Sequence, residues 1–253
     1  AGGVKRRCEH GIHAPSIGLV PIAGGAPFIP STRAIEHAHH RYRTYVLYNG
    51  CVTTERRYAE LHAHSAFTFL DGTDEPARMV EEAARLGLDA LAILDVDGMY
   101  STVQTTMAAR TVGLPIVYGA ELTLAWDALR GIVAGSSAPG WGLAPGAEDP
   151  GMRLPILAAS PRGYGNLVGA MSERALNEPG QRHPRHDLVN LSEAGGDLIV
   201  LTGGRRGPLM RALRAGGAVF ARRVLDGLVD AFSRDHVLVE WQGARGDEEE
   251  VGD

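Results

Sequence analysis

The chain has 253 residues, of which 44% are hydrophobic and 22% charged, and its formal net charge is −5. This length can bury a full core, and the acidic balance argues against a surface that coats nucleic acid throughout. Two cysteines, Cys8 and Cys51, are too few for a disulfide framework, which favours a reducing, cytoplasmic home. No run approaches the roughly 18 apolar residues of a membrane span, and prolines and glycines break up the apolar region after Lys5, which argues against a secretory signal.

Three segments differ in character. Residues 1–56 show no sustained period and are expected to form an irregular extension, in which the CEHGIH and HAHH stretches are interpreted as solvated tail. Strand and helix patterns alternate over residues 57–246, which we interpret as one domain. Residues 247–253 form an acidic tail.

The first half of this domain predicts a strand over 58–61 and a helix over 76–86. Pro76 suits a first helical turn, and Gly87 suits the position that ends a helix. LDALAIL, residues 88–94, is almost continuously apolar, as expected for a parallel strand buried on both faces. A helix over 100–112 and a strand over 116–124 follow.

The second half begins with a Gly/Pro-rich stretch, 127–151, which is interpreted as an inserted loop. The patterns then predict a strand over 154–159, a helix over 164–176, a polar loop over 181–186, a strand over 197–201, helices over 208–215 and 219–232, and a strand over 237–241. About six strand signals are visible where a closed barrel has seven or eight, so we expect the chain to be cut short.

The stretch YAELHAHSAFTFLDG, residues 58–72, contains a possible metal site. On a strand the side chains at i and i+2 point to the same side, so His62 and His64 can both reach one ion. Asp71 on the following loop could bridge to a second ion, because carboxylates suit bridging positions. A pair of solvent-exposed loop histidines is the alternative. Carboxylates after the next two strand signals, Asp95 and Asp97 and then Glu121, favour the metal site, because active sites of barrels gather at the carboxyl ends of strands.

The motifs YAELHAHSAFTFLDG, LGLDALAILDVDG, GLPIVYGAELTL, LAASPRGYGNL and LTGGRRG together resemble a known family. They are similar to the polymerase-and-histidinol-phosphatase (PHP) domain at the N-terminus of bacterial C-family DNA polymerases, the polymerase III alpha subunits, and most similar to their error-prone branch. The resemblance implies an α/β fold, a distorted TIM-like (βα)7 barrel that is incomplete here. It also implies metal-dependent phosphoester hydrolysis with zinc or manganese. Four residues match ligand positions: His62, His64, Asp71 and the bridging Glu121, with Asp95 and Asp97 as weaker candidates.

Several positions depart from the family pattern. Val96 stands where TDHDG motifs carry a histidine, Arg153 where a histidine opens the later strand, and Gly204 where a cysteine or histidine is expected. The final Asp-x-His pair would lie beyond Asp253. Valine and glycine side chains offer no donor, and arginine adds a positive charge where a cation would sit. We therefore expect at most one weakly bound zinc or manganese ion and no efficient hydrolysis.

Two functions compete. The first is the N-terminal module of an error-prone DNA-directed DNA polymerase, acting with DNA and accessory proteins in replication and translesion repair. This chain alone would not extend a primer, because the polymerase palm lies outside it. The alternative is a freestanding PHP phosphoesterase. A metal-dependent deaminase or amidohydrolase is weaker, since the downstream strands lack the lysine or histidines it needs.

An arginine-rich stretch spans residues 203–225 and contains no acidic residue. Arginines at this density can lie along nucleic-acid phosphates. The structural alternative is a pair of helices that carry these arginines on their solvent-facing sides. The candidates for contact with nucleic acid are Arg205, Arg206, Arg211 and Arg214.

Overall fold

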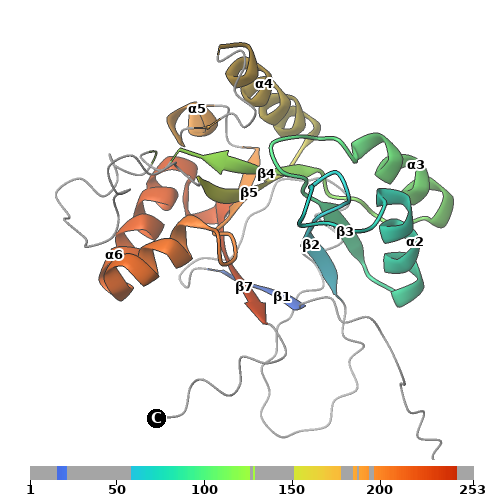
Figure 1. Ribbon diagram of the computed structural model, residues 1–253, viewed down its shortest axis with the longest axis horizontal. Helices are drawn as coiled ribbons and strands as arrows, with labels where there is room; N and C mark the ends of the chain where they lie inside the picture. Colours follow the sequence, from blue (N-terminus) through green and yellow to red (C-terminus); the bar gives the residue numbers. More distant parts are fainter. Residues whose placement is uncertain are drawn as a thin grey trace, which may run out of the picture.

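The computed structural model describes residues 16–21, 58–125, 128, 151–177, 185–186, 188–193 and 197–243. The CEHGIH and HAHH stretches, most of the predicted loop 127–151 and the acidic tail lie outside these ranges. In chain order (Figure 1) the elements are β1 (Ser16–Pro21), β2 (Ala59–Ala63), α2 (Pro76–Leu86), β3 (Ala90–Ile93), α3 (Thr102–Val112), β4 (Gly119–Leu124), β5 (Met152–Ala158), α4 (Pro161–Asn177), α5 (Leu188–Glu193), β6 (Leu198–Leu201), α6 (Pro208–Phe232), a 3₁₀ turn (Arg234–His236) and β7 (Val237–Gly243).

The fold is mixed α/β with two hydrogen-bonded sheets. One has the strand order β1-β7-β6-β5-β4, and the other pairs β2 with β3. Two isolated parallel bridges, Leu91 with Ile116 and Val96 with Glu121, connect the β3 segment to the β4 segment. The strands therefore follow one another in space as β2, β3, β4, β5, β6, β7 and β1.

Side chains alternate between two faces along these strands. One face of β4, β5 and β6 packs against α4, α5 and α6, through residues that include Leu122, Leu154, Ile156, Leu198 and Val200. The other face contributes to an interior cluster made of Ala92, Leu94, Val117, Leu157, Ala159, Ile199 and Leu201, with Leu61 and Leu238 packed against it. Since β2, β3, β5, β6 and β7 all contribute to it, both sheets share this interior. Helices α2 and α3 cover β3 from the outside (Figure 1).

The predicted elements inside the domain are largely confirmed. Helix α2 has the predicted bounds, and Gly87 ends it in the left-handed region at φ 73°. The two helices predicted over 208–232 appear as α6 with a break at Gly217, whose φ and ψ are 69° and −169°. The six-residue helix α5 was not predicted, because one and a half turns are too short to show a helical period.

Two expectations need correction. Residues 1–56 are not irregular throughout, since Ser16–Pro21 forms β1 and pairs antiparallel with β7. The partner strand β7 lies more than 200 residues further along the chain. Local periodicity cannot reveal a strand that forms by pairing with so distant an edge. The second correction concerns the (βα)7 barrel implied by the resemblance, whose regular form has parallel strands: here β5 is antiparallel to both β4 and β6. An antiparallel neighbour needs no crossover helix, which agrees with the absence of a helical pattern between 127 and 151 in the sequence.

The antiparallel direction of β5 brings its first residues to the end of the sheets where the other strands finish, here called the rim. Leu124 at the end of β4 pairs with Met152 at the start of β5. The first residues of β5 therefore lie at the same rim as the carboxyl ends of β2, β4, β6 and β7.

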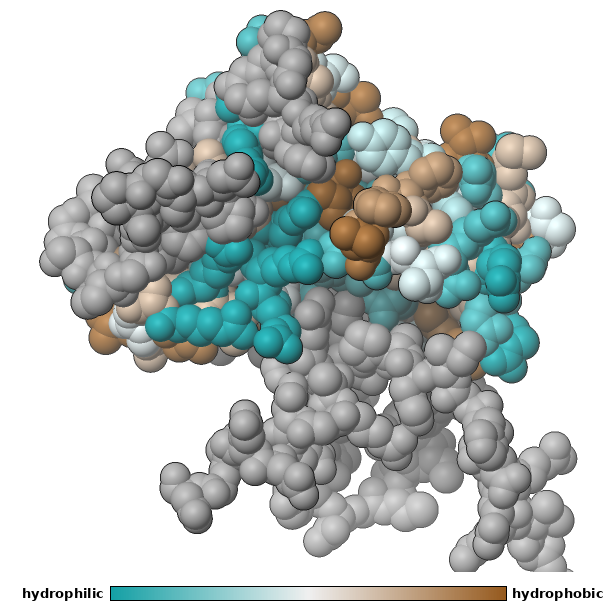
Figure 2. Space-filling model, in the orientation of Figure 1, coloured by the Kyte–Doolittle hydropathy of each residue, from teal (hydrophilic) through white to brown (hydrophobic). Residues whose placement is uncertain are grey.

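Figure 2 shows hydrophobic side chains next to hydrophilic ones on the front face. The hydrophobic side chains on the loop after β2 are exposed: Phe67, Phe69 and Leu70. The hydrophilic side chains gather over α6 and the loop that precedes it, where Arg205, Arg206 and Arg214 are exposed (Figure 2).

Candidate metal centre

Strand β2 brings two histidines to the rim. The rings of His62 and His64 lie 5.2 Å apart in an edge-to-face arrangement, as expected for residues at i and i+2. The pairing of β2 with β3 is irregular between Glu60 and Ala63, the segment that contains His62. The backbone N–H of His62 donates to Oε1 of Glu60 at 2.9 Å, which fixes the main chain at this irregularity.

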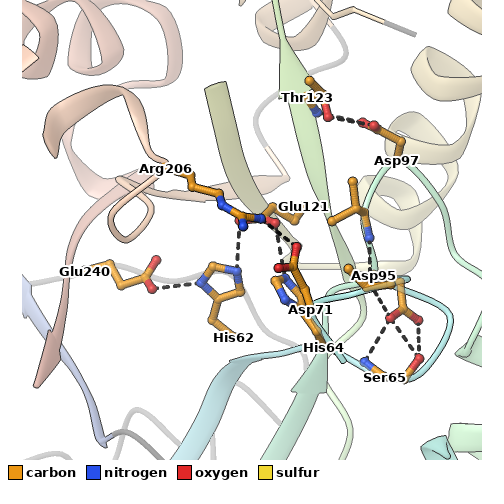
Figure 3. A network of polar contacts seen from close by, with 12 residues as sticks. His62, His64, Ser65, Asp71, Asp95, Asp97, Glu121, Thr123, Arg206 and Glu240 are labelled. Atoms are coloured by element: carbon orange, nitrogen blue, oxygen red, sulfur yellow. Dashed lines mark hydrogen bonds and ion pairs between the residues drawn. The ribbon is translucent and has the colours of Figure 1, made fainter. Parts of the chain in front are cut away.

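Glu121 on β4 faces both histidines (Figure 3). Its Oε1 lies 3.2 Å from Nε2 of His62, and its Oε2 lies 3.2 Å from Nε2 of His64. The neighbours Ala120 and Leu122 pack against the helices, so alternation turns Glu121 towards the interior side of the sheet. The carboxylate is buried and touches both rings from one strand position.

A second buried carboxylate, Glu240 on β7, lies on the other side of His62. Its Oε1 is 2.8 Å from Nδ1 of His62, and its backbone N–H donates to Oγ1 of Thr202 at 2.9 Å. The sequence reasoning did not single out this residue. Its signal was an acidic residue within the otherwise apolar run VLVEW, which is unusual on a strand buried against a core.

The two carboxylates control the charge of the histidine between them. Burial alone would lower the pKa of His62, but Glu121 and Glu240 outweigh it and raise the pKa to about 10. Burial would likewise raise the pKa of Glu121, yet His62 and His64 lower the pKa to about 2. Without a metal, His62 is therefore an imidazolium between two carboxylates.

The three residues His62, His64 and Glu121 can hold a metal ion. Among the described residues, they alone bring ligand atoms together in this way, all within 4.8 Å of one another. Nε2 of His62 and Nε2 of His64 are buried and lack a well-directed hydrogen bond. Two imidazole nitrogens and a carboxylate form the donor set that zinc commonly takes. The donor set fits one ion, and Glu240 on Nδ1 would orient His62 towards it.

Asp95 makes hydrogen bonds to the loop after β2. Its Oδ1 accepts hydrogen bonds from the backbone N–H of Ser65 at 3.0 Å, from Oγ of Ser65 at 2.8 Å and from Oγ1 of Thr68 at 2.8 Å. Thr68 in turn accepts a hydrogen bond from the backbone N–H of Val96 at 3.2 Å. Asp95 thus ties the loop after β2 to the end of β3. It lies at the rim, as predicted, but outside the group of three.

Asp97 and Asp71 are also held by other partners. Asp97 accepts hydrogen bonds from the backbone N–H and from Oγ1 of Thr123, both at 2.6 Å. Oδ2 of Asp71 lies 2.7 Å from Nη1 of Arg206, which reaches over the site from the loop before α6 (Figure 3). Neither aspartate belongs to the group of three.

The departures from the family pattern lie around the same rim. Val96 follows β3 and forms an isolated bridge with Glu121. Arg153 stands at the start of β5, opposite Thr123 of β4. Gly204 lies in the loop between β6 and α6, the loop that also carries Arg206. No metal donor is therefore added by these three side chains.

The predicted arginine stretch divides between the rim and α6. Arg206 pairs with Asp71, and Nη1 of Arg214 donates to the backbone oxygen of Arg205 at 3.2 Å. Arg205 and Arg214 are exposed, and Arg211 is half-buried. Within this stretch, Arg206 is thus the arginine that contacts a predicted ligand residue.

Comparison with known proteins identifies the family of this chain. The PHP domain matches residues 60–244. An error-prone DNA polymerase of Mycobacterium bovis is 42% identical over 184 residues, covering 72% of this chain and 16% of the polymerase. Those of Mycolicibacterium paratuberculosis and Nocardia farcinica are 44% and 39% identical, and the match covers 16% and 18% of their lengths. The chain therefore spans less than a fifth of the length of these relatives.

Proposed function

Because this chain belongs to the PHP domain family, we propose that it is the PHP module of an error-prone, C-family DNA-directed DNA polymerase. The observation that carries the proposal is the identity of 42% over 184 residues to a polymerase of that name. The work of such a polymerase, nucleotidyl transfer during replication and translesion repair, takes place on chromosomal DNA. We accordingly assign the module to the bacterial cytoplasm.

We propose a distorted, incomplete (βα)7 barrel as the architecture of the module. Three observations support it: the bridges that connect β3 to β4, the interior cluster shared by both sheets, and the helices on the outside of the strands (Figure 1). Its rim at the carboxyl ends of the strands is where barrel enzymes hold their active sites.

The module holds at most one zinc or manganese ion, on His62, His64 and Glu121. A bound ion of this kind polarises phosphoryl oxygens and lowers the pKa of bound water. Asp71 could join only by leaving Arg206, and Asp95 only by releasing the loop after β2. A single ion with three protein ligands is a poor substitute for a multinuclear centre, so we propose that the module does not hydrolyse phosphoesters efficiently.

The partners of the module are DNA and the proteins of the replication machinery. Arg205, Arg206, Arg211 and Arg214 support contact with phosphates, because three of them are exposed on one loop and the following helix. Part of this charge is already engaged, since Arg206 pairs with Asp71.

A freestanding PHP phosphoesterase is the second candidate. The intact group of His62, His64 and Glu121 favours it, since this group would be dispensable in a purely structural module. The two functions differ in a direct way: a phosphoesterase releases phosphate from substrates without any polymerase present.

A hybrid polymerase tests the proposal. The 184 matching residues of the Mycobacterium bovis polymerase are replaced by the corresponding segment of this chain, and primer extension is measured. We expect extension by the hybrid and none by this chain alone. A matched control hybrid carries Glu82→Gln on the exposed face of α2. A folded hybrid without extension, together with manganese-dependent phosphate release by the chain alone, would favour the phosphoesterase.

A further inference from the structure

Arg153 is a partly buried cation without a partner. Its Nη1 is buried and has no hydrogen-bond acceptor, and within the described part of the chain its guanidinium makes no ion pair. Leaving a buried charged donor unsatisfied costs more than leaving a neutral one. An arginine on the solvent face of a helix would be hydrated and would not show this feature. The position therefore indicates a site for an anion.

The strand fixes which way Arg153 points. Leu157 of β5 packs into the interior cluster, and Arg153 lies four residues earlier, on the same face. Across the sheet it pairs with Thr123, which shares its face of β4 with Glu121. Arg153 therefore stands on the interior face at the rim, on the strand next to the metal centre.

The neighbouring carboxylates are engaged with partners other than Arg153. Glu121 and Glu240 share the imidazolium of His62, and Asp71 is paired with Arg206. Asp97 is satisfied by Thr123, which lies directly opposite Arg153. Each of these four carboxylates has other partners, and none of them makes an ion pair with Arg153.

Arg206 is the natural second donor. The backbone N–H of Arg153 donates to the backbone oxygen of Arg206 at 3.0 Å, so the two residues are neighbours in space. The loop of Arg206 is packed tightly there, since a Cβ on Gly203 would lie 2.8 Å from the backbone oxygen of Arg153. The side chain of Arg206 is largely exposed, and its single ion pair leaves further N–H groups for a ligand.

We propose that Arg153 and Arg206 form a phosphate-binding site beside the group of His62, His64 and Glu121. The ligand is a phosphate group, for which guanidinium groups offer forked, charge-assisted hydrogen bonds. The site needs no metal, because the two arginines themselves carry the positive charge. The source of the phosphate rests on the proposed function. In a DNA polymerase module, it is the terminal phosphate of a single DNA strand.

Thermal unfolding of the full chain in EDTA tests the site. Inorganic phosphate is compared with chloride at equal ionic strength. We expect phosphate to raise Tm, because a ligand that binds the folded state stabilises it. Arg153→Met should raise Tm in chloride, since it removes an unpaired buried charge, and should abolish the response to phosphate. Arg162→Ala, which removes an exposed arginine paired with Asp197, should respond like the wild type.

Titration with short single-stranded oligonucleotides, with and without a terminal phosphate, distinguishes the two sources. We expect Arg153→Met to weaken binding of the phosphorylated strand about 10- to 100-fold, and Arg153→Lys to recover part of it. Tighter binding of inorganic phosphate than of the strand would identify free phosphate as the ligand and leave the site intact. Binding that requires added metal, or an Arg153→Met response equal to that of the wild type, would overturn the site. Neither result depends on primer extension, which tests the proposed function separately.

Discussion

The carboxylate of Glu240 lies 2.8 Å from Nδ1 of His62, although 178 residues separate the two in the chain. Both side chains are buried at this contact, which holds the imidazole in one orientation with Nε2 towards Glu121. Carboxylates in this position orient histidine ligands in many metal sites and strengthen them as donors. Glu240 is accordingly the residue through which β7 contacts the candidate metal centre.

Removing this carboxylate should weaken metal binding. We expect Glu240→Ala to lower zinc affinity about 10- to 100-fold, measured by competition with a chromogenic chelator. Glu240→Gln should recover part of the loss, because its amide oxygen still accepts a hydrogen bond from Nδ1. Glu82→Gln, on the exposed face of α2, is the matched control and should leave the affinity unchanged. Equal affinities for Glu240→Ala and the wild type would show that His62 does not depend on Glu240.

The same contact predicts a pH dependence of stability in the metal-free protein. The pKa of His62 is raised to about 10, so its stabilising charge is fully present below about pH 6.5 and is lost as the pH rises towards 10. The pKa of Glu121 is lowered to about 2, so its contribution is present above about 4.5 and is lost as the pH falls towards 2. The free energy of unfolding should therefore be highest between these limits.

Urea unfolding in EDTA between pH 6 and 9 checks the alkaline arm. The wild type should lose stability across this range, and Glu240→Gln should lose less, because it removes one of the two carboxylates that raise the pKa of His62. Parallel curves for the two proteins would contradict the coupling.

Local signals in the sequence predicted the elements that carry the site. Pro76 and Gly87 bound α2 correctly, since both residues act through their own backbone conformations. The spacing of His62 and His64 placed both rings on one side, because the period of a strand is short and regular. The proximity of His62 and Glu121 at one rim was predicted from their places at the carboxyl ends of strand signals, and it is confirmed by the 3.2 Å between Nε2 of His62 and Oε1 of Glu121.

Contacts between distant segments were not predictable in the same way. Asp71 remains a predicted metal ligand, and its contact with Arg206, 135 residues further along, could not be predicted. The direction of β5 and the pairing of β1 with β7 also depend on which edges meet in space. Local periodicity predicts which face of a segment is buried, but not which other segment pairs with it. For this reason the roles of Asp71 and Glu240 became visible only in the structure.

The hydrogen bonds of Asp95 predict a structural role. Asp95→Ala would leave donors on Ser65 and Thr68 without an acceptor in a buried setting. We expect the free energy of unfolding to fall by about 2–4 kcal/mol. Asp74→Ala, on the exposed part of the same loop, should change it by less than about 0.5 kcal/mol. Equal urea midpoints for the two variants would mean that Asp95 does not anchor the loop.

The break in α6 predicts opposite effects of alanine at two glycines. Gly217 has φ 69° and ψ −169°, a conformation almost restricted to glycine, so Gly217→Ala should destabilise the protein by about 1–3 kcal/mol. Gly165 lies inside α4, and a Cβ added there would meet open space. Gly165→Ala should therefore stabilise it by about 0.5–1 kcal/mol. Chemical denaturation of both variants checks this pair, and a loss of stability in Gly165→Ala would contradict it.

The last prediction concerns the number of metal ions. His62, His64 and Glu121 form one set of donors, and Val96, Arg153 and Gly204 add none at the neighbouring positions of the rim. Metal analysis after loading with zinc or manganese and gel filtration should find at most one ion per chain. His62→Ala should lose that ion, because the two remaining donors are too few to hold it. Hydrolysis of a model phosphodiester to its monoester and alcohol, with manganese added, should stay at background in both proteins. Two or more tightly held ions, or hydrolysis that disappears in His62→Ala, would show that the centre is complete and that donors beyond this group take part.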